Sequence, residues 1–337
     1  MQPLASSSLN VADDEGRWFR FVRTFFLVGF GGLAILLVII FVSDPYDSGH
    51  FPFALIAGTP DKDSRFANAS HGRDLRFNAA IFGNSHGQAL NPERLSSAAG
   101  MNFVQMTVAG ASPREQLVLM KWFAHHHATI GSIVLVVDDW WCTHDPALPI
   151  RYEFPFWLYS GSILDYLPKL LTTQSFDRAT RRMALALGLA KVADPTGFDD
   201  YEAGVNWSFA PAPDDRPTAD ASGGLQKQPD KYPAIEQLEA TLSAFSRDFP
   251  VVLVMPYVYS TVLPKPQTEA AADINNCKAA FANMINKRPR ASFLDMRLDS
   301  PLARDPKNFM DNTHYRKNLA IIIENRIASA LGATAHH

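Results

Sequence analysis

The sequence predicts an α/β protein with a doubly wound parallel sheet, preceded by one transmembrane helix. Two observations support the sheet: short apolar runs alternate with segments of helical spacing, and glycine or acidic residues follow several of these runs. A long uncharged stretch near the N-terminus supports the membrane helix. The chain has 337 residues, 47% of them hydrophobic, which is enough to bury a full core.

The stretch from Thr24 to Val42 contains no charged residue. About 20 residues at about 1.5 Å each match the roughly 30 Å hydrocarbon core of a bilayer. We therefore expect a transmembrane anchor at residues 24–43, after a cytoplasmic tail at residues 1–23. A cleaved signal peptide is the main alternative, but its apolar region usually spans about 7–15 residues and ends in small residues. Here the polar segment 43–46 follows instead.

The charges on either side of this stretch predict its orientation. Arg17, Arg20 and Arg23 precede it, whereas Asp44 and Asp47 follow it. Because basic residues favour the cytoplasmic side of a membrane, we expect the N-terminus inside the cell. The main domain is then extracytoplasmic, or periplasmic if the inner membrane of a Gram-negative cell holds the anchor.

Two cysteines, Cys142 and Cys277, lie in the part predicted to be exported. An oxidising compartment permits a disulfide between them, and a disulfide would pair both cysteines of the sequence. Two unpaired thiols that pack as small hydrophobic groups are an equal alternative.

Composition argues against several classes of partner. The formal net charge is −3 and the predicted exported part has no basic stripe, so we expect no nucleic-acid binding. The run His125–His127 lies at a predicted helix end, and adjacent histidines do not share a helix face as metal ligands would. We expect no metal and no cofactor, and we interpret His336 and His337 as a solvated tail.

The alternation of elements sets the predicted domain organisation. Residues 44–76 are rich in Pro, Gly, Asp and Ser and predict a linker or entry loop, and residues 77–337 predict the α/β domain. We expect strands at residues 77–82, 102–108, 133–137, 251–255 and 292–294. We expect helices at residues 113–127, 234–249, 268–286 and 315–331.

A region at about residues 140–232 interrupts this alternation. It begins with an aromatic-rich stretch and ends in a run rich in Pro, Gly and Asp from Asp194 to Pro229. We expect a helical and loop insertion over the carboxyl face of the sheet, with substrate contacts or simple packing as equal alternatives.

Two short motifs supply the chemistry. Ser85 lies in a Gly-x-Ser-x-Gly segment directly after the first predicted strand, and Asp311 and His314 form an Asp-x-x-His segment near the end of the chain. A serine hydroxyl becomes a nucleophile when a base takes its proton, and the base works best when a carboxylate orients it. The Gly-x-Ser-x-Gly segment matches the nucleophile elbow of α/β-hydrolases, but such an elbow normally follows several strands.

The arrangement resembles the SGNH (GDSL-like) hydrolase superfamily, in particular its membrane-anchored members associated with acylation of cell-surface polysaccharides. Gly83-Asn84-Ser85 corresponds to the block after the first strand, Gly110 to the glycine after the second, and Asp311 with His314 to the terminal block. The resemblance covers roughly residue 77 to the C-terminus without the insertion. It implies a flavodoxin-like sheet, a catalytic triad of Ser85, His314 and Asp311, and an oxyanion hole.

The oxyanion hole is implied at the backbone N–H groups of Ser85 and Gly110, with Asn84 as a further donor. One departure concerns the third block, where Asp138-Asp139-Trp140 replaces the asparagine of the family. A carboxylate there would repel the oxyanion, and loss of one donor typically costs about 10² to 10³ in rate. His86, Asp138, Asp139 and Trp140 are candidates for substrate contacts.

The resemblance implies a serine esterase or O-acyltransferase that acts on O-acyl groups of a cell-surface glycan, most simply acetyl, through an acyl-serine. A membrane-bound O-acyltransferase is the implied protein partner. The alternative is a catalytically inactive, membrane-tethered binding or assembly module, which the departure at Asp138 and Asp139 favours.

Overall fold

A computed structural model describes residues 11–51, 53–54, 56–148, 152–211 and 232–333. The terminal histidines and the second half of the Pro/Gly/Asp-rich run, residues 212–231, lie outside the described residues.

The described residues form a five-stranded parallel sheet in the order β2-β1-β3-β4-β5. Its strands are β1 (Ala79–Gly83), β2 (Phe103–Thr107), β3 (Ser132–Val136), β4 (Val251–Met255) and β5 (Ala291–Asp295). This flavodoxin-like order confirms the predicted fold class. Because β1 has β2 on one side and β3 on the other, the chain changes direction at β1, and a crevice opens beyond the carboxyl ends of such strands.

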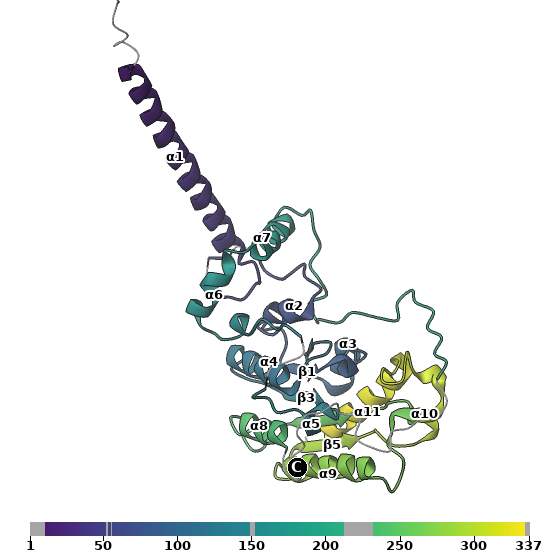
Figure 1. Cartoon of the computed structure of the whole chain (residues 1–337). Helices are drawn as coiled ribbons and strands as arrows, with labels where there is room; N and C mark the ends of the chain where they lie inside the picture. The colour runs from purple at the N-terminus through teal and green to yellow at the C-terminus, as the bar shows by residue number, and fades with distance from the viewer. Residues whose placement is uncertain (1–10, 52, 55, 149–151, 212–231, 334–337) are drawn as a thin grey trace, which may run out of the picture.

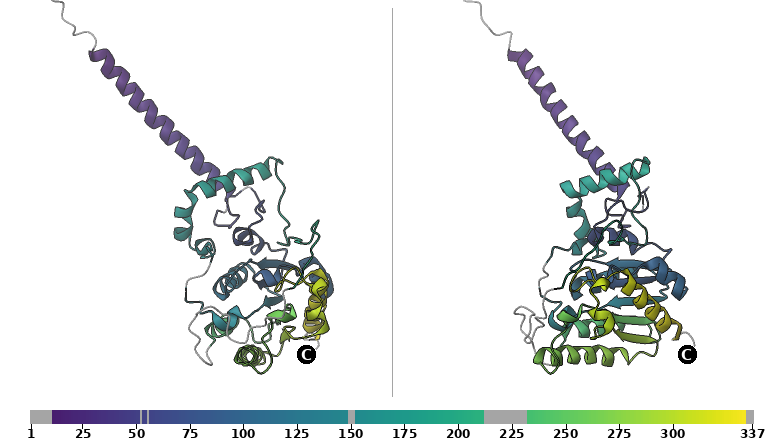
Figure 2. Two further views of the ribbon diagram at one scale, coloured as in Figure 1. Left: turned by 45° about the vertical axis from the view of Figure 1, so that its right-hand side comes forward. Right: turned by 90° about the vertical axis from the view of Figure 1, so that its right-hand side faces the viewer.

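Helices cover both faces of the sheet (Figure 2). One face packs against α3 (Pro92–Ala99) and α11 (Lys317–Ala333). The other face packs against α4 (Pro113–His126), α8 (Pro233–Leu242) and α9 (Glu269–Ile285). The remaining helices are α1 (Val11–Ser43), α2 (Ser64–His71), α5 (Trp140–Thr143), α6 (Ile163–Leu170), α7 (Thr173–Ala186) and α10 (Pro301–Arg304).

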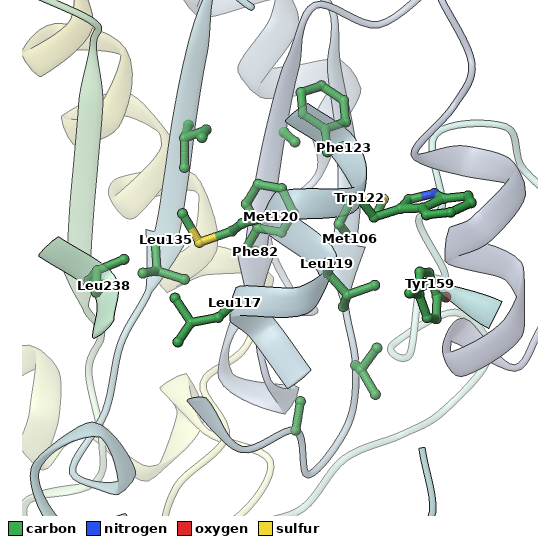
Figure 3. Packing of buried hydrophobic residues seen from close by; sticks show 14 of the residues in the cluster. Phe82, Met106, Leu117, Leu119, Met120, Trp122, Phe123, Leu135, Tyr159 and Leu238 are labelled. Atoms are coloured by element: carbon green, nitrogen blue, oxygen red, sulfur yellow. The ribbon is translucent and has the colours of Figure 1, made fainter. Parts of the chain in front are cut away.

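The core between α4 and the sheet shows why these segments fold as they do (Figure 3). Pro113 begins the helix, where the N–H that it lacks has no partner in any case. Leu117, Met120 and Phe123 recur every three residues and lie on one side of α4, packed in the same buried cluster as Phe82 of β1. Burial of each such side chain contributes about 1.5–3 kcal/mol.

The helix α1 projects from the domain as a long rod (Figure 1). Within it, the segment Gly16–Ser43 is long and apolar enough to cross a membrane, and 6% of its most apolar window is buried in the domain. The helix begins at Val11, well before the predicted span, and its last turn enters the domain, where Ile40 and Ser43 are buried.

The segment 44–76, for which we predict a linker or entry loop, packs into the domain. It contains α2 and the buried carboxylate of Asp47, which accepts hydrogen bonds from Arg73 at 2.6 Å and from Arg182 at 3.1 Å. Arg182 is itself fully buried on α7 and also donates to the backbone carbonyl of Ser43 at 2.6 Å. Segment 44–76 and the insertion therefore both fix the end of α1 in the domain.

The insertion divides into two parts. Helices α6 and α7 lie beside the end of α1 (Figure 1), whereas the chain after α7 runs back to the sheet. The aromatic stretch that opens the insertion is largely packed inside, since Phe154 and Tyr159 are buried.

Candidate active site

The turn that presents Ser85 depends on close packing of β1 against β3. A Cβ atom added at Gly83 would lie 2.9 Å from the Cβ of Val136, so a glycine is required where β1 ends. The Oδ1 of Asn84 then accepts a hydrogen bond from the N–H of His86 at 3.0 Å and starts a short 3₁₀ turn at residues 85–87. Ser85 thus lies at the carboxyl edge of the sheet on a rigid turn.

The loop that carries Asp311 and His314 is closed on itself. Its ends meet in an antiparallel bridge between Phe309 and Tyr315, and the N–H of Met310 donates to the carbonyl of His314 at 2.8 Å. The hydroxyl of Tyr315 donates to the carbonyl of His86 at 2.6 Å. This last bond attaches the loop directly to the turn beside Ser85.

Ser85, His314 and Asp311 form a continuous hydrogen-bonded chain. The Nε2 of His314 lies 2.9 Å from the Oγ of Ser85, and its Nδ1 lies 2.8 Å from the Oδ2 of Asp311. Because an ionised carboxylate only accepts hydrogen bonds, Nδ1 carries the hydrogen in neutral His314. The lone pair of Nε2 then faces the serine hydroxyl, which is the arrangement that activates a serine nucleophile.

Asp311 is held ionised by the groups around it. Partial burial raises the pKa of its carboxyl group, but hydrogen bonds from the backbone N–H groups of Thr313 and His314, together with the His314 side chain, outweigh burial and lower the pKa. The two backbone bonds are 2.8 and 2.9 Å long. The loop itself therefore supplies a fixed negative charge behind His314.

A second histidine and carboxylate pair lies next to this chain. His86 Nδ1 lies 3.2 Å from the Oδ2 of Asp138, and the His86 and His314 rings are 5.4 Å apart. Asp138 is buried and also accepts hydrogen bonds from the side chain of Asn84 and from the N–H of Trp140.

Burial raises the pKa of Asp138, but His86, the charge of Arg297 and the bond from Asn84 outweigh it and lower the pKa below its usual value. The Asn84 amide, considered above as an oxyanion donor, thus has a structural partner in Asp138.

Asp139 and Trp140, the next two residues of the third block, have their contacts with residues other than Ser85. Asp139 forms an ion pair with the buried guanidinium of Arg297. Trp140 stacks on His144 with ring centroids 5.0 Å apart. Neither residue contributes to the cavity described below.

Two backbone donors remain for an oxyanion. Gly110 follows β2 in a left-handed conformation with φ of +68°, and a Cβ atom there would lie 2.7 Å from the Tyr152 ring. Among the described residues, the N–H groups of Ser85 and Gly110 donate no hydrogen bond to another protein group. Both residues follow neighbouring parallel strands at the same edge of the sheet.

A cavity of about 220 Å³ opens at Ser85 and His314. It is smaller than the roughly 300–1,000 Å³ of sites for drug-sized ligands. From the insertion it is lined by Phe198, Asp199, Asp200, Tyr201, Glu202 and Trp207, and from the rest of the domain by Ser85, His86, Gln88, Ala89, Arg94, Met310, Asp311, His314, Tyr315 and Lys317. Of the candidates for substrate contacts, His86 lines the cavity, whereas Asp138, Asp139 and Trp140 do not.

The lining residues of the insertion carry no motif in the sequence, and sequence reasoning did not single them out. Glu202 attaches their loop to the last helix, because its carboxylate accepts from Arg316 Nε at 2.8 Å and from the N–H of Lys317 at 2.5 Å. The second bond lies at the first turn of α11, where a negative charge is favourable. The start of α11 needs a carboxylate acceptor for its free N–H groups, and this need is the signal that points to a residue such as Glu202.

Cys142 and Cys277 form a disulfide with Cα atoms 5.7 Å apart. It joins α5, which follows Asp138 and Asp139, to the middle of α9. The bond therefore fixes the segment after β3 to the outer helix layer.

The histidine run at the end of α4 is engaged with the backbone. The Nδ1 of His126 lies 2.9 Å from the carbonyl of Trp122, and the Nε2 of His127 lies 3.0 Å from the carbonyl of Gly72. Within the described residues, no group of three His, Cys, Asp or Glu side chains is arranged to hold a metal ion.

No model of a known protein family matches the sequence, and no curated protein matches it either. Fold and site therefore define the protein as a flavodoxin-like α/β protein with a long N-terminal apolar helix and a Ser-His-Asp constellation at the carboxyl edge of its sheet.

Proposed function

We propose that this protein is a membrane-anchored, extracytoplasmic serine esterase or O-acyltransferase of the SGNH hydrolase type. The observation that carries the proposal is the chain of hydrogen bonds from Ser85 through His314 to Asp311, with distances of 2.9 and 2.8 Å. Its three members correspond to the blocks of that superfamily after the first strand and near the C-terminus. The flavodoxin-like strand order supports the same assignment.

In the first half of the reaction, Ser85 Oγ attacks the carbonyl carbon of an ester while His314 Nε2 takes the hydroxyl proton. The negative charge moves to the carbonyl oxygen, where the N–H groups of Ser85 and Gly110 stabilise it. Asp311 stabilises the imidazolium that forms. The carbon–oxygen bond of the ester then breaks, the alcohol leaves with the proton from His314, and the acyl group remains on Ser85.

In the second half, a water molecule or another hydroxyl group gives its proton to His314 and attacks the acyl-serine. The bond to Ser85 breaks, and Oγ regains a proton from His314. Water yields a free acid, whereas a hydroxyl acceptor yields a new ester. The same residues serve both outcomes, so the acceptor that reaches the cavity decides between hydrolysis and transfer.

The cavity supports a short acyl group on a larger carrier. Its volume of about 220 Å³ suits an acetyl ester more readily than a long acyl chain. Tyr201 and Trp207, which are 46% and 36% exposed, line its side and offer aromatic surface to the carrier. Aromatic faces of this kind, beside a few polar groups, favour a glycan as that carrier.

The location follows from α1 and the disulfide. The apolar segment of α1 serves as the anchor, with Arg17, Arg20 and Arg23 on the cytoplasmic side. The Cys142–Cys277 bond suits an oxidising compartment. A membrane-bound O-acyltransferase is the partner that would supply or share acyl groups at this surface.

The inactive-module alternative depends on Asp138. Its carboxylate is tied to Asn84 and His86 and does not line the cavity, which supports the enzymatic proposal.

Substitution of Ser85 tests the proposal. The full chain is reconstituted in nanodiscs and assayed with p-nitrophenyl acetate. We expect S85A to lower kcat/KM by about 10⁴ to 10⁶, because loss of a triad nucleophile costs this much in known serine enzymes. The matched control is S97A on the exposed side of α3, which should leave the rate unchanged. An unchanged rate in S85A would exclude the serine mechanism and leave the inactive module.

A covalent probe sharpens the same test. A fluorophosphonate should add to Ser85 of the wild-type chain, as read by peptide mass spectrometry, and S85A should remain unmodified. Modification of another serine in place of Ser85 would contradict the proposed role.

A further inference from the structure

Exposed apolar side chains gather on the insertion next to the end of α1. They lie on α6 and directly after it, on α7, and on the segment that follows α7: Leu164, Leu167, Leu171, Phe176, Leu187 and Leu189. Two of them, Leu164 and Leu189, are 76% and 78% exposed. Single exposed leucines are ordinary, but several of them on neighbouring elements mark an interaction surface.

The spacing of these residues makes α6 amphipathic. Tyr166 and Leu170 face the domain and are buried, whereas Leu164, Leu167 and Leu171 recur at i, i+3 and i+7 on the outer side. The outer side therefore carries an apolar stripe that nothing in the described structure covers.

Helix α7 continues this surface. Its inner side presents Ser175, Ala179 and Arg182, all buried. Phe176 near its start and Leu187 just past its end are exposed apolar residues, and the exposed ion pair of Asp177 and Arg181 lies between them. Figures 1 and 2 show α7 lying across the end of α1. A helix in this position lies beside the membrane surface when α1 spans the bilayer.

The connection between α1 and the domain contains no spacer. Ile40 and Ser43 are already buried, and so are the five residues that follow, from Asp44 to Ser48. The apolar helix thus enters the domain directly, and any bilayer that holds α1 must reach the domain surface beside α7.

The length of α1 places that surface at the right depth. Over the uncharged stretch from Thr24 to Val42 the helix rises about 27 Å at 1.5 Å per residue, close to the roughly 30 Å of a hydrocarbon core. Its last turn, at residues 39–43, then lies at the outer boundary of that core, where Arg182 of α7 donates to the carbonyl of Ser43.

We propose that α6, α7 and residues 187–192 lie in the interfacial layer of the membrane, with their exposed leucines among the acyl chains and Lys169 and Lys191 at anionic headgroups. Both lysines are exposed. Amphipathic helices with this division of side chains bind at the boundary between headgroups and acyl chains. The inference depends on α1 as an anchor but not on the proposed catalysis.

Site-directed spin labelling of the full chain in nanodiscs tests the depth of this surface. Nitroxide labels are placed by L164C and L187C, each in the disulfide-bonded protein, and their collision rates with oxygen and with a water-soluble nickel chelate are measured. L33C, on the exposed part of α1, is the reference for lipid. L298C, 54% exposed after β5 at the sheet edge far from α1, is the reference for water.

We expect the ratio of oxygen to nickel collisions at positions 164 and 187 to exceed that at position 298 several-fold and to approach that at position 33. A ratio equal to that at position 298 would overturn the proposal, because the surface would then face water. Low collision rates with both reagents would also overturn it, since a protein partner or a second copy would then cover the helices. A water-like ratio at position 33 would remove the anchor as well.

Discussion

Two histidine and carboxylate pairs flank Ser85, and they are built in opposite ways. The pair of His314 and Asp311 is local in sequence, and the Asp311 side chain is 56% exposed. The pair of His86 and Asp138 joins the ends of β1 and β3, and the Asp138 side chain is 3% exposed. Only His314 directs its second ring nitrogen to the serine.

This difference separates a pair suited to proton transfer from a pair suited to holding the sheet edge together. A general base must exchange protons with substrate, which partial exposure permits. A buried carboxylate with several hydrogen-bond donors instead makes its partners costly to remove. Substitutions at His314, His86 and Asp138 test whether the two pairs have these separate roles.

The largest expected effect is that of H314A. We expect kcat/KM for p-nitrophenyl acetate to fall by about 10⁴ to 10⁶, because Ser85 loses the base that the proposed mechanism requires. The thermal midpoint of unfolding, followed by circular dichroism, should stay close to that of the wild type because the ring is partly exposed. Full activity in H314A, or a variant that no longer folds, would contradict the assignment of His314 to proton transfer and not to stability.

Removal of the disulfide by C142S/C277S should act on stability. The bond closes a loop across a sequence separation of 135 residues. Its loss should lower the free energy of unfolding by about 2–5 kcal/mol, as for other native disulfides. Urea denaturation of the detergent-solubilised protein measures this, and the esterase rate below the transition should stay within a few-fold of wild type. A stability equal to that of the wild type would show that α5 is held by packing alone.

The variant H86A should lower stability more than activity, which is the opposite of what we expect for H314A. Asp138 would keep its charge but lose its ring partner, and loss of a hydrogen bond to a buried charge costs about 1.5–3 kcal/mol. We expect a lower unfolding midpoint with much less loss of activity than in H314A. The double variant H86A/D138N removes the unpaired charge and should recover part of the stability. An inactive but fully stable H86A would instead assign His86 to the chemistry.

The smallest effect is the pH dependence of stability. The pKa of Asp138 lies below its ordinary value of 3.8 in the folded protein. A carboxyl group with a lowered folded pKa stabilises the fold above its unfolded pKa, and this contribution disappears as the pH falls through the folded pKa.

Unfolding midpoints measured from pH 7 down to pH 3 should therefore fall more for the wild type than for D138N below about pH 4. The variant D311N should change the curve less, because Asp311 is more exposed to solvent. Parallel curves for the wild type and D138N would contradict the assignment of a stabilising role to Asp138.

Local patterns predicted much of this fold. The strand at Val251–Met255 was predicted to the residue, and the other strands to within two residues at either end. Each is a short apolar run whose period does not depend on distant contacts. Helix α3 escaped prediction because Leu95 is its only large apolar residue, so the segment has no periodic apolar face.

The candidate site was also predictable in part. The turn at Ser85 and the loop at Asp311 and His314 could be recognised from short motifs, because tight turns need glycine and the pair is local. The partners of Asp138 and the loop attached by Glu202 could not, since each contact closes a long stretch of chain that no local pattern encodes.

By itself, the amino-acid sequence determined the α/β class, the apolar N-terminal helix and the residue types for a serine relay, because these depend on periodicity and composition over a few neighbours. Tertiary structure decided which nitrogen of His314 faces Ser85, that Asp138 is buried among donors, and that α7 lies against the end of α1. These outcomes depend on packing between segments far apart in the chain, where geometry selects one arrangement among many that the same local patterns permit.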